Sequence, residues 1–207
     1  GRVHGIDLSA DMIQLARETF SGRNYPNVRF QQMDATKIQL ARAFHVVFST
    51  AALHWMADHQ AVLNGVRACL KPGGRLLFQM GGRGNADEVY DVLQAVMAAE
   101  AWRPYFEDFG YPYHFLGPDA YERWLPACGF QLRRAELIPK DMMHQGREGF
   151  KGWLRTTWFP YTNRLPADRR DAFLDEVVAG YLTVHPLDDE GKTHVEMVRL
   201  EIEAICR

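Results

Sequence analysis

Short apolar segments alternate with amphipathic segments over residues 1–80, and this alternation restricts the fold more than any other feature of the chain. Hydrophobic side chains three and four positions apart predict helices over residues 9–20 and 58–70. The apolar segments between them are typical of β-strands and cover residues 3–6, 28–33, 45–49 and 75–80. Strands and helices in this order build βαβ units with helices on both faces of a mostly parallel sheet. The sequence therefore predicts a doubly wound α/β fold.

Polar side chains follow three of these strands, at Asp7, Asp34 and Thr50. In open α/β sheets the ligand site lies at the carboxyl ends of the strands. A carboxylate at Asp7 can accept hydrogen bonds from both hydroxyls of a nucleoside ribose. A carboxylate at Asp34 can accept one from an adenine amino group. Each acid alone fits a helix cap or an Asx turn about equally well, but two at consecutive strand ends favour a nucleoside site.

A ribose-binding acid usually follows a glycine-rich loop by about 20 residues. Only six residues precede Asp7. We therefore expect the first strand and the glycine loop of such a fold to be missing from this chain, through truncation or as a real departure.

Four segments, taken together, resemble the core of class I S-adenosylmethionine-dependent methyltransferases. They are Gly5–Met12, Asp34–Ala35, Phe48–Trp55 and Leu70–Gly74. The resemblance covers residues 1–80 and implies a Rossmann-like sheet that binds S-adenosylmethionine as cofactor. His45 stands where the family commonly has Asp, at the end of the strand that is remote from the ligand.

The resemblance also implies roles for individual residues near the nucleoside. Asp7 would bind the ribose hydroxyls. Leu8 and Met12 would pack on the adenine, whereas Asp34 and Ala35 would bind its polar edge.

Further along the chain, the resemblance gives Thr50 a place beside the methionine arm of the cofactor. His54 and Trp55 would face the methyl-transfer cavity and position the reacting groups.

The second half of the sequence has a different character. Asn85 and Glu88 have the spacing of a capping box at the start of a helix that reaches about residue 102. The aromatic side chains of residues 102–124 could stack on nucleic-acid bases, but without a basic excess they favour a lid over an apolar pocket. The tail 198–204 alternates strictly, which is typical of a half-exposed antiparallel edge strand.

These patterns predict three regions. Residues 1–84 form the cofactor-binding core, incomplete at its N-terminus. Residues 85–196 form a helical lid and substrate region that contributes a core strand near 130–138. Residues 197–207 form a C-terminal antiparallel core strand that pairs with the strand near 130–138.

Two further segments resemble, more narrowly, trans-aconitate 2-methyltransferase and its relatives, including the malonyl-carrier-protein type. They are Gly81–Asn85 and Trp153–Thr156. Both types methylate free carboxylates. Arginine matches a carboxylate bidentately, although a solvated arginine and a core tryptophan are the competing interpretations. The expected substrate contacts are Arg83, Asn85, Tyr113, Trp153 and Arg155, with Arg147 a further clamp candidate.

Composition excludes several partners. The net charge of −2 argues against a nucleic-acid binder, which usually has a basic excess. No apolar segment approaches the roughly 18 residues that cross a bilayer. The three cysteines are widely spaced and odd in number, which favours a reducing, cytoplasmic setting. His54, Asp58 and His59 form a weak metal motif, and a capped helix start is favoured there, so no metal is expected.

The expected function is methyl transfer from S-adenosylmethionine to a small-molecule acceptor, with a carboxylate oxygen favoured. A carboxylate is already ionised at pH 7, so the reaction needs no strong base. Methylation of a hydroxyl or carbon would need a base such as His54. A non-catalytic or partner-dependent methyltransferase-like module and a nicotinamide-dependent dehydrogenase are the alternatives from other classes. Oligomeric state does not follow from the sequence.

Overall fold

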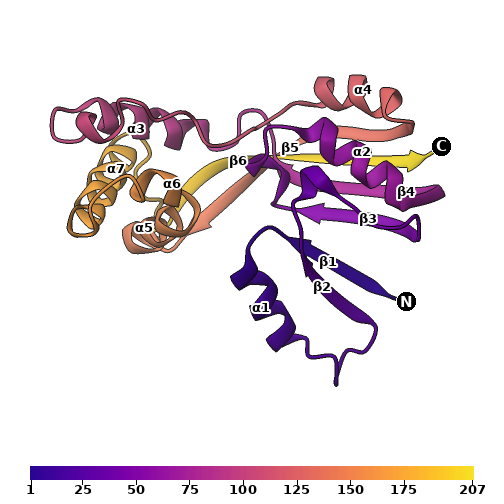
Figure 1. Ribbon diagram of the computed structural model, residues 1–207. Helices are drawn as coiled ribbons and strands as arrows, with labels where there is room; N and C mark the ends of the chain where they lie inside the picture. The colour runs from indigo at the N-terminus through magenta and orange to yellow at the C-terminus, as the bar shows by residue number, and fades with distance from the viewer. The chain divides into compact units, whose positions relative to one another are not determined.

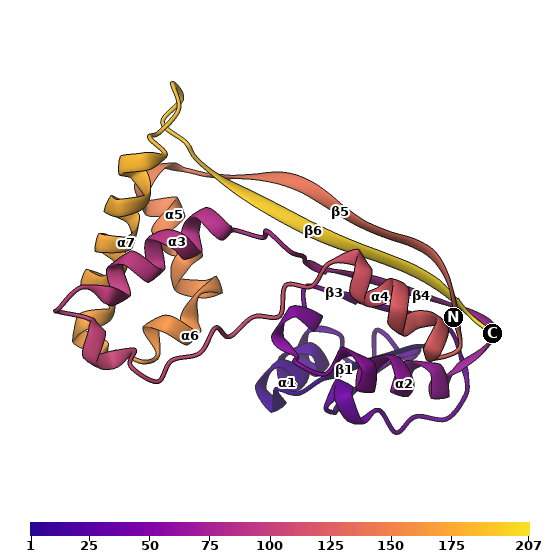
Figure 2. The same ribbon diagram turned by 90° about the horizontal axis from the view of Figure 1, so that it is seen from above.

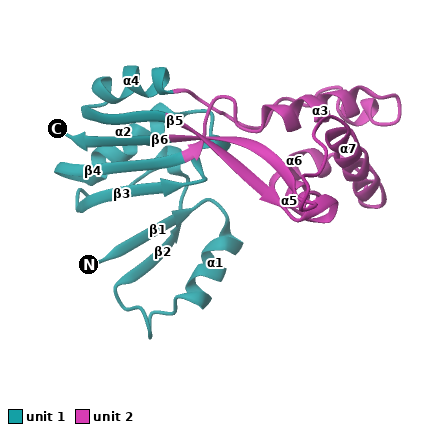
Figure 3. Ribbon diagram, turned by 180° about the vertical axis from the view of Figure 1, so that it is seen from behind, with its two compact units in different colours: residues 1–79, 118–136, 201–207 teal, residues 80–117, 137–200 magenta.

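The computed structural model describes residues 1–207 and has the predicted α/β character (Figure 1). The chain divides into two compact units (Figure 3). Unit 1 comprises residues 1–79, 118–136 and 201–207, and unit 2 comprises residues 80–117 and 137–200. The three predicted regions follow different boundaries and remain a prediction.

Unit 1 contains most of the β-structure, arranged in two sheets. A parallel pair is formed by β1 (Val3–Asp7) and β2 (Val28–Gln32). A four-stranded sheet has the order β3-β4-β6-β5. Its strands are β3 (Phe44–Thr50), β4 (Leu70–Gly81), β5 (Phe130–His144) and β6 (Thr193–Cys206). The β1–β2 pair and the four-stranded sheet are separate sheets.

The helices of unit 1 begin and end where their caps predict. Helix α1 (Ala10–Thr19) starts after Ser9, whose hydroxyl accepts the N–H of Met12. Helix α2 (His59–Cys69) starts after Asp58, whose carboxylate accepts the N–H of Ala61 at 2.8 Å. Side-chain oxygens at these positions satisfy N–H groups that have no partner within the helix. Helix α4 (Pro118–Ala127) is followed by Gly129 at a φ of +82°, as expected for a glycine stop.

Two short 3-10 helices of unit 1 follow strand ends: η1 (Ala35–Lys37) comes after β2 and η2 (Leu53–Trp55) comes after β3. Leu53 is 2% exposed and fixes η2 against the unit.

The segment 71–74 forms a bulge within β4, so this strand begins at Leu70 and not at residue 75 as the sequence predicts. Leu70 pairs with Phe44, whereas Arg75 pairs with Val46, so the strand accommodates extra residues between these pairs. Gly73 has a φ of +77°, which a glycine adopts without a Cβ clash.

The prediction that the C-terminal strand lies at an edge is wrong. β6 lies between β4 and β5, and β5 is the edge strand. The arrows of β5 and β6 run in opposite directions, as predicted for this pair (Figure 1). The alternation that suggested a half-exposed strand is real, because Leu200, Ile202 and Ala204 are buried on one face. Alternation reports the two faces of a strand and carries no information about its neighbours.

Unit 2 is mainly helical, and its main helices pack together (Figures 1 and 2). They are α3 (Asp87–Ala98), α5 (Gly146–Thr157), α6 (Phe159–Thr162) and α7 (Arg170–Val184), with the 3-10 helices η3 (Arg103–Tyr105) and η4 (Ala167–Arg169). Their apolar faces form one hydrophobic core that is rich in aromatic side chains.

The predicted capping box at Asn85 is wrong. The residue before α3 is Ala86, at a φ of +56°, and it makes no side-chain cap bond. The Asn85 side chain instead accepts the backbone N–H of Val198 in β6 at 3.0 Å. A tertiary partner therefore replaces the local one that the spacing suggests.

The glycines that precede α3 permit close packing. A Cβ at Gly82 would lie 2.5 Å from Leu137 and 2.9 Å from Leu200, and a Cβ at Gly81 would lie 2.6 Å from Phe115. These contacts make the segment a tightly packed connection between β4 and α3. None of the helices combines the length with the apolar character that a membrane span requires.

Candidate functional site

The predicted cofactor residues all belong to unit 1 and follow the carboxyl ends of its strands. β1 and β2 are parallel, and Asp7 pairs with Gln32, so Asp7 and Asp34 lie at the same edge of their sheet. The carboxyl ends of β1, β2 and β3 face the same side of the unit (Figure 1). The structure thus brings the two acids together as the sequence predicts.

Asp7 is exposed, and its Oδ1 accepts the backbone N–H of Ser9 at 2.8 Å. Its backbone oxygen accepts the N–H of Met33, which fixes the end of β1 to the end of β2. The turn orients the carboxylate at the strand end. The capping role and the ligand role that compete in the sequence are therefore compatible in the structure.

Asp34 is half-buried, and its Oδ1 accepts both the backbone N–H and the hydroxyl of Thr36, at 2.8 and 2.7 Å. The Thr36 hydroxyl, then the Thr36 backbone N–H, hold the pKa of Asp34 below its usual range. Lys37 lies 3.8 Å from Oδ2. The carboxylate is ionised at neutral pH and can only accept hydrogen bonds.

An exposed apolar strip lies beside these acids. Leu8 is 67% exposed, Met12 52% and Leu15 54%, whereas Ile13 is the buried residue of α1. Exposed large apolar side chains that lie together mark binding surfaces. The amphipathic pattern of residues 9–20 therefore describes a helix whose apolar side chains are largely outside the core of unit 1.

The region after β3 carries the two predicted positioning residues. Thr50 pairs with Gln79 in β4, and the N–H of the next residue, Ala51, donates to the Gln79 oxygen at 2.9 Å. Ala51 has a φ of +53°, so the chain turns sharply into η2, which carries His54 and Trp55. The rings of His54 and Trp55 lie 5.5 Å apart.

The His54 imidazole is a weaker base than an ordinary histidine. Burial, then the charge of nearby His59, lowers the pKa of His54 to about 4. The imidazole is therefore neutral at pH 7 and a weak base.

The motif of His54, Asp58 and His59 lies at the start of α2. Asp58 caps α2, and His59 is 1% exposed with its Nδ1 2.6 Å from the Tyr121 hydroxyl. The structure contains no group of three His, Cys, Asp or Glu side chains placed to hold a metal ion. The contact between His59 and Tyr121 joins α2 to α4, and no local pattern in the sequence indicates it.

The predicted substrate residues all belong to unit 2, in different surroundings. Arg83 is exposed, and Asn85 is engaged with Val198. Tyr113 is 4% exposed and donates its hydroxyl to the Thr157 oxygen at 2.7 Å. These roles remain predictions.

Trp153 and Arg155 both lie on α5. Trp153 is half-buried, and its ring stacks on Phe150 at 5.9 Å, in line with the core role that the sequence also allowed. Arg155 donates to Asp171 of α7 at 3.0 Å. Arg147, the other clamp candidate, lies 3.6 Å from Asp175.

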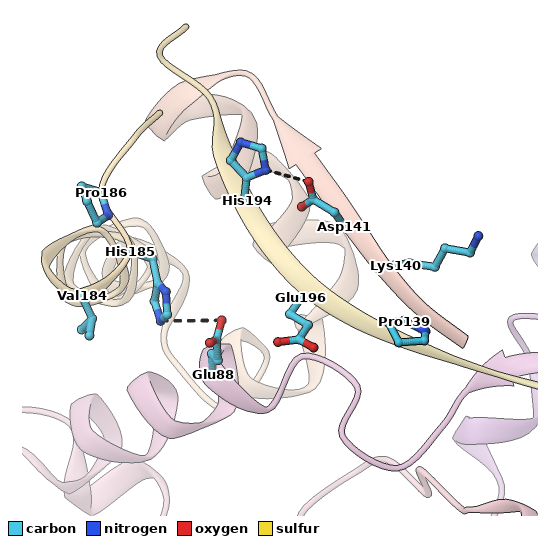
Figure 4. Close-up of a pocket in the computed structure, with 9 residues that line it drawn as sticks. All are labelled: Glu88, Pro139, Lys140, Asp141, Val184, His185, Pro186, His194 and Glu196. Carbon is cyan, nitrogen blue, oxygen red and sulfur yellow. Dashed lines mark hydrogen bonds and ion pairs between the residues drawn. The ribbon is translucent and has the colours of Figure 1, made fainter. Parts of the chain in front are cut away.

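A hollow of about 570 Å³ opens on unit 2 where α3, α7, β5 and β6 meet (Figure 4). His194 of β6 contacts Asp141 of β5 at 2.7 Å through Nδ1, and Asp188 at 2.9 Å through Nε2. His185 lies 3.6 Å from Glu88. These groups satisfy one another, and no local pattern in the sequence indicates the hollow.

Comparisons with known proteins show the family to which this chain belongs. Residues 1–78 match the methyltransferase domain family. An uncharacterized methyltransferase of Schizosaccharomyces pombe is 31% identical over 98% of this chain and 77% of its own length. The chain belongs to the class I S-adenosylmethionine-dependent methyltransferases. It is accordingly an enzyme whose cofactor is S-adenosylmethionine.

Two further relatives extend the comparison. Trans-aconitate 2-methyltransferase of Variovorax paradoxus is 29% identical over 98% of this chain and 77% of its own length. The crystal structure of a putative methyltransferase from Bacillus halodurans aligns with a TM-score of 0.64, covering 99% of this chain and 83% of the other at 17% identity. This methyltransferase therefore has the Rossmann-like fold that the sequence predicts. The match to the methyltransferase family, and not the fold, distinguishes it from a nicotinamide-dependent dehydrogenase.

Proposed function

We propose that this methyltransferase transfers the methyl group of S-adenosylmethionine to a carboxylate oxygen of a small organic acid. The observation that carries the proposal is the depressed pKa of His54, about 4, in the region after β3. A base this weak does little to remove the proton of a hydroxyl or a carbon acid. A carboxylate acceptor is already deprotonated at pH 7 and needs no such help.

The related trans-aconitate 2-methyltransferase supports the same acceptor class. The methyl group is electrophilic because it is bound to the positively charged sulfur of the cofactor. With the cofactor bound, a carboxylate oxygen of the acceptor would take this methyl group as the carbon–sulfur bond breaks, and the products would be a methyl ester and S-adenosylhomocysteine. The protein's contribution is then to align oxygen, carbon and sulfur and to exclude water.

The residues of unit 1 fit a nucleoside. Asp7 would accept hydrogen bonds from the ribose hydroxyls, and Leu8 and Met12 would cover the adenine with their exposed side chains. Asp34 and the Ala35 N–H would bind the adenine edge. An exposed apolar strip beside two acids supports this assignment.

Two residue groups complete the proposed roles. Thr50 would line the methionine arm, and His54 and Trp55 would position the acceptor. Of the residues proposed for substrate binding, Arg83 is exposed. Asn85, Tyr113 and Arg155 would have to bind substrate in addition to their hydrogen bonds within the protein, or in place of them. Trp153 would contribute apolar surface.

The acceptor class is tested with S-adenosylmethionine labelled in its methyl group, offered with a panel of mono-, di- and tricarboxylic acids and acyl carriers. The proposal expects label in products that release methanol on mild base treatment, as esters do. Base-stable label alone would contradict it and indicate a carbon or nitrogen acceptor. S-adenosylhomocysteine is titrated into the protein first, to establish cofactor binding separately from acceptor choice.

A further inference from the structure

The Asp34 carboxylate accepts one more hydrogen bond than its turn requires. Its Oδ1 accepts the backbone N–H of Thr36 at 2.8 Å and also the Thr36 hydroxyl at 2.7 Å. The bond from the backbone N–H is sufficient to close the turn that begins η1. The hydroxyl therefore adds a contact that the path of the chain does not need.

Two other acids in unit 1 occupy similar turns and have no second donor of this kind. Asp7 Oδ1 accepts the backbone N–H of Ser9, and Asp58 Oδ1 accepts the backbone N–H of Ala61, each at 2.8 Å. A single backbone bond holds each of these two carboxylates. Among the three acids, only Asp34 has two donors on the same oxygen.

A second donor on Oδ1 restricts how the Asp34 carboxylate can rotate. The terminal torsion of an aspartate side chain is broad, so one hydrogen bond still permits rotation about the Cβ–Cγ bond. Two donors hold Oδ1 in one direction and thereby fix the direction of Oδ2. The Lys37 Nζ lies 3.8 Å from Oδ2, and the Lys37 side chain is 78% exposed. Oδ2 is therefore the oxygen of Asp34 that a ligand can approach.

The segment that carries Thr36 is supported by packing within unit 1. η1 packs against α2. Ile38 comes so close to Gly65 of α2 that a Cβ at Gly65 would lie 2.8 Å from the Ile38 Cβ. Thr36 itself is half-buried. A packed segment, and not a free loop, thus presents the hydroxyl to Asp34.

A fixed, ionised carboxylate oxygen can select between purine bases. The Thr36 hydroxyl, then the Thr36 backbone N–H, lower the pKa of Asp34, so its Oδ2 only accepts hydrogen bonds at neutral pH. Adenine has an amino group at C6, which donates, whereas a 6-oxo purine has an oxygen there, which accepts. Two acceptors that face each other repel. A fixed Oδ2 would therefore favour adenine over hypoxanthine.

We propose that Thr36 is a positioning residue, whose hydroxyl directs Asp34 Oδ2 toward the amino group of the cofactor's adenine and so makes the site selective for a 6-amino purine. The inference rests on the adenine contact proposed above for Asp34 and specifies what orients it. Without the hydroxyl the carboxylate would rotate, hold the amino group less well and become able to accept the N1–H of a 6-oxo purine.

The test measures Kd by calorimetry for S-adenosylhomocysteine and S-inosylhomocysteine, which differ by an amino group or an oxygen at C6. In Thr36→Val we expect Kd for S-adenosylhomocysteine to rise about five- to tenfold, because its carboxylate contact is no longer oriented. Kd for S-inosylhomocysteine should stay within about twofold or fall. Thr36→Ser keeps the hydroxyl and should restore the wild-type selectivity. Thr19→Val, at the exposed end of α1, is the matched control and should leave both affinities unchanged.

Equal weakening of both ligands in Thr36→Val would overturn the inference, because a loss of structure affects both alike. Thermal unfolding of each variant ensures that affinities are compared where all are folded. Asp34→Asn tests the adenine contact itself, since the amide adds a donor and should reduce the selectivity most.

The two variants distinguish the inference from the proposal on which it rests. Reduced selectivity in Asp34→Asn with unchanged affinities in Thr36→Val would overturn the role of Thr36 and leave the adenine contact of Asp34 standing. Unchanged selectivity in Asp34→Asn would overturn both. The acceptor class is decided separately, by the base treatment of the labelled product.

Discussion

Asparagine can replace Asp7 without loss of the local turn, because the turn needs only the side-chain oxygen that accepts the N–H of Ser9. Asp7→Asn retains an oxygen for that bond but loses the charge and one acceptor for the ribose hydroxyls. Hydrogen bonds to charged groups contribute about 1.5–3 kcal/mol. We therefore expect S-adenosylhomocysteine to bind about 10- to 100-fold more weakly in calorimetry. Asp11→Asn, in the first turn of α1, is the matched control, and equal weakening in both variants would contradict a ribose contact.

His54 yields a prediction about pH. Because burial and the charge of His59 lower its pKa to about 4, the imidazole does not titrate between pH 6 and 8. The rate of methyl transfer at saturating substrate should therefore be flat over this range for the wild type and for His54→Asn. A wild-type profile that rises with an apparent pKa near 6.5, and that flattens in His54→Asn, would show that His54 acts as a base.

The connection between β4 and α3 depends on Gly82. An added Cβ would lie 2.5 Å from Leu137 Cδ2 and 2.9 Å from Leu200 Cβ. Gly82→Ala is therefore expected to destabilise the protein by about 1–3 kcal/mol in urea unfolding, as overpacking does. Gly152 in α5 has open space around its Cα, so Gly152→Ala should stabilise the helix by about 0.5–1 kcal/mol. Equal effects of the two substitutions would show that the connection is not tightly packed.

His194 of β6 joins this strand to β5 through Asp141 (Figure 4). It also contacts Asp188, in the loop that precedes β6. Hydrogen bonds to Asp188, then to Asp141, raise the pKa of His194, so its contribution to stability is present below about pH 6.5 and is lost as the pH rises through the folded value. The His194 hydrogen bond lowers the pKa of Asp188, and that contribution is lost on acidification below its ordinary value.

The Tm difference between wild type and His194→Asn should therefore be larger at pH 6 than at pH 8.5. The His194 and Asp188 side chains are partly exposed. Added salt should therefore reduce the difference in Tm between wild type and His194→Asn. A difference that does not depend on pH would show that the His194 contacts act without its charge.

For the whole molecule, the cofactor is expected to protect unit 1 selectively. A ligand that binds only the folded state stabilises it by about 2.7 kcal/mol at 100 times its Kd. S-adenosylhomocysteine should therefore raise Tm and slow amide exchange most strongly over β1, α1 and β2, which carry the proposed nucleoside contacts. Protection that is equal over α5 and α7 would contradict a cofactor site built from unit 1.

Local patterns accounted for much of this fold. Ser9 and Asp58 mark helix starts because a side-chain oxygen next to free N–H groups is a local interaction, and Gly129 marks a helix end for a similar reason. Asp7 and Asp34 could be placed together because the carboxyl ends of neighbouring parallel strands share one edge. The methyltransferase family followed from these acids taken with the segments around them.

The tertiary structure decided the interactions whose partners lie far apart in the chain. It engages Asn85 with Val198 instead of a helix end and places β6 between β4 and β5. Spacing cannot predict either, because a side chain takes its best partner among all those the fold brings near. The same reason explains the contact between His59 and Tyr121. The sequence by itself determined that His59 lies at the start of a helix, and only the fold of unit 1 decided that its ring meets the Tyr121 hydroxyl.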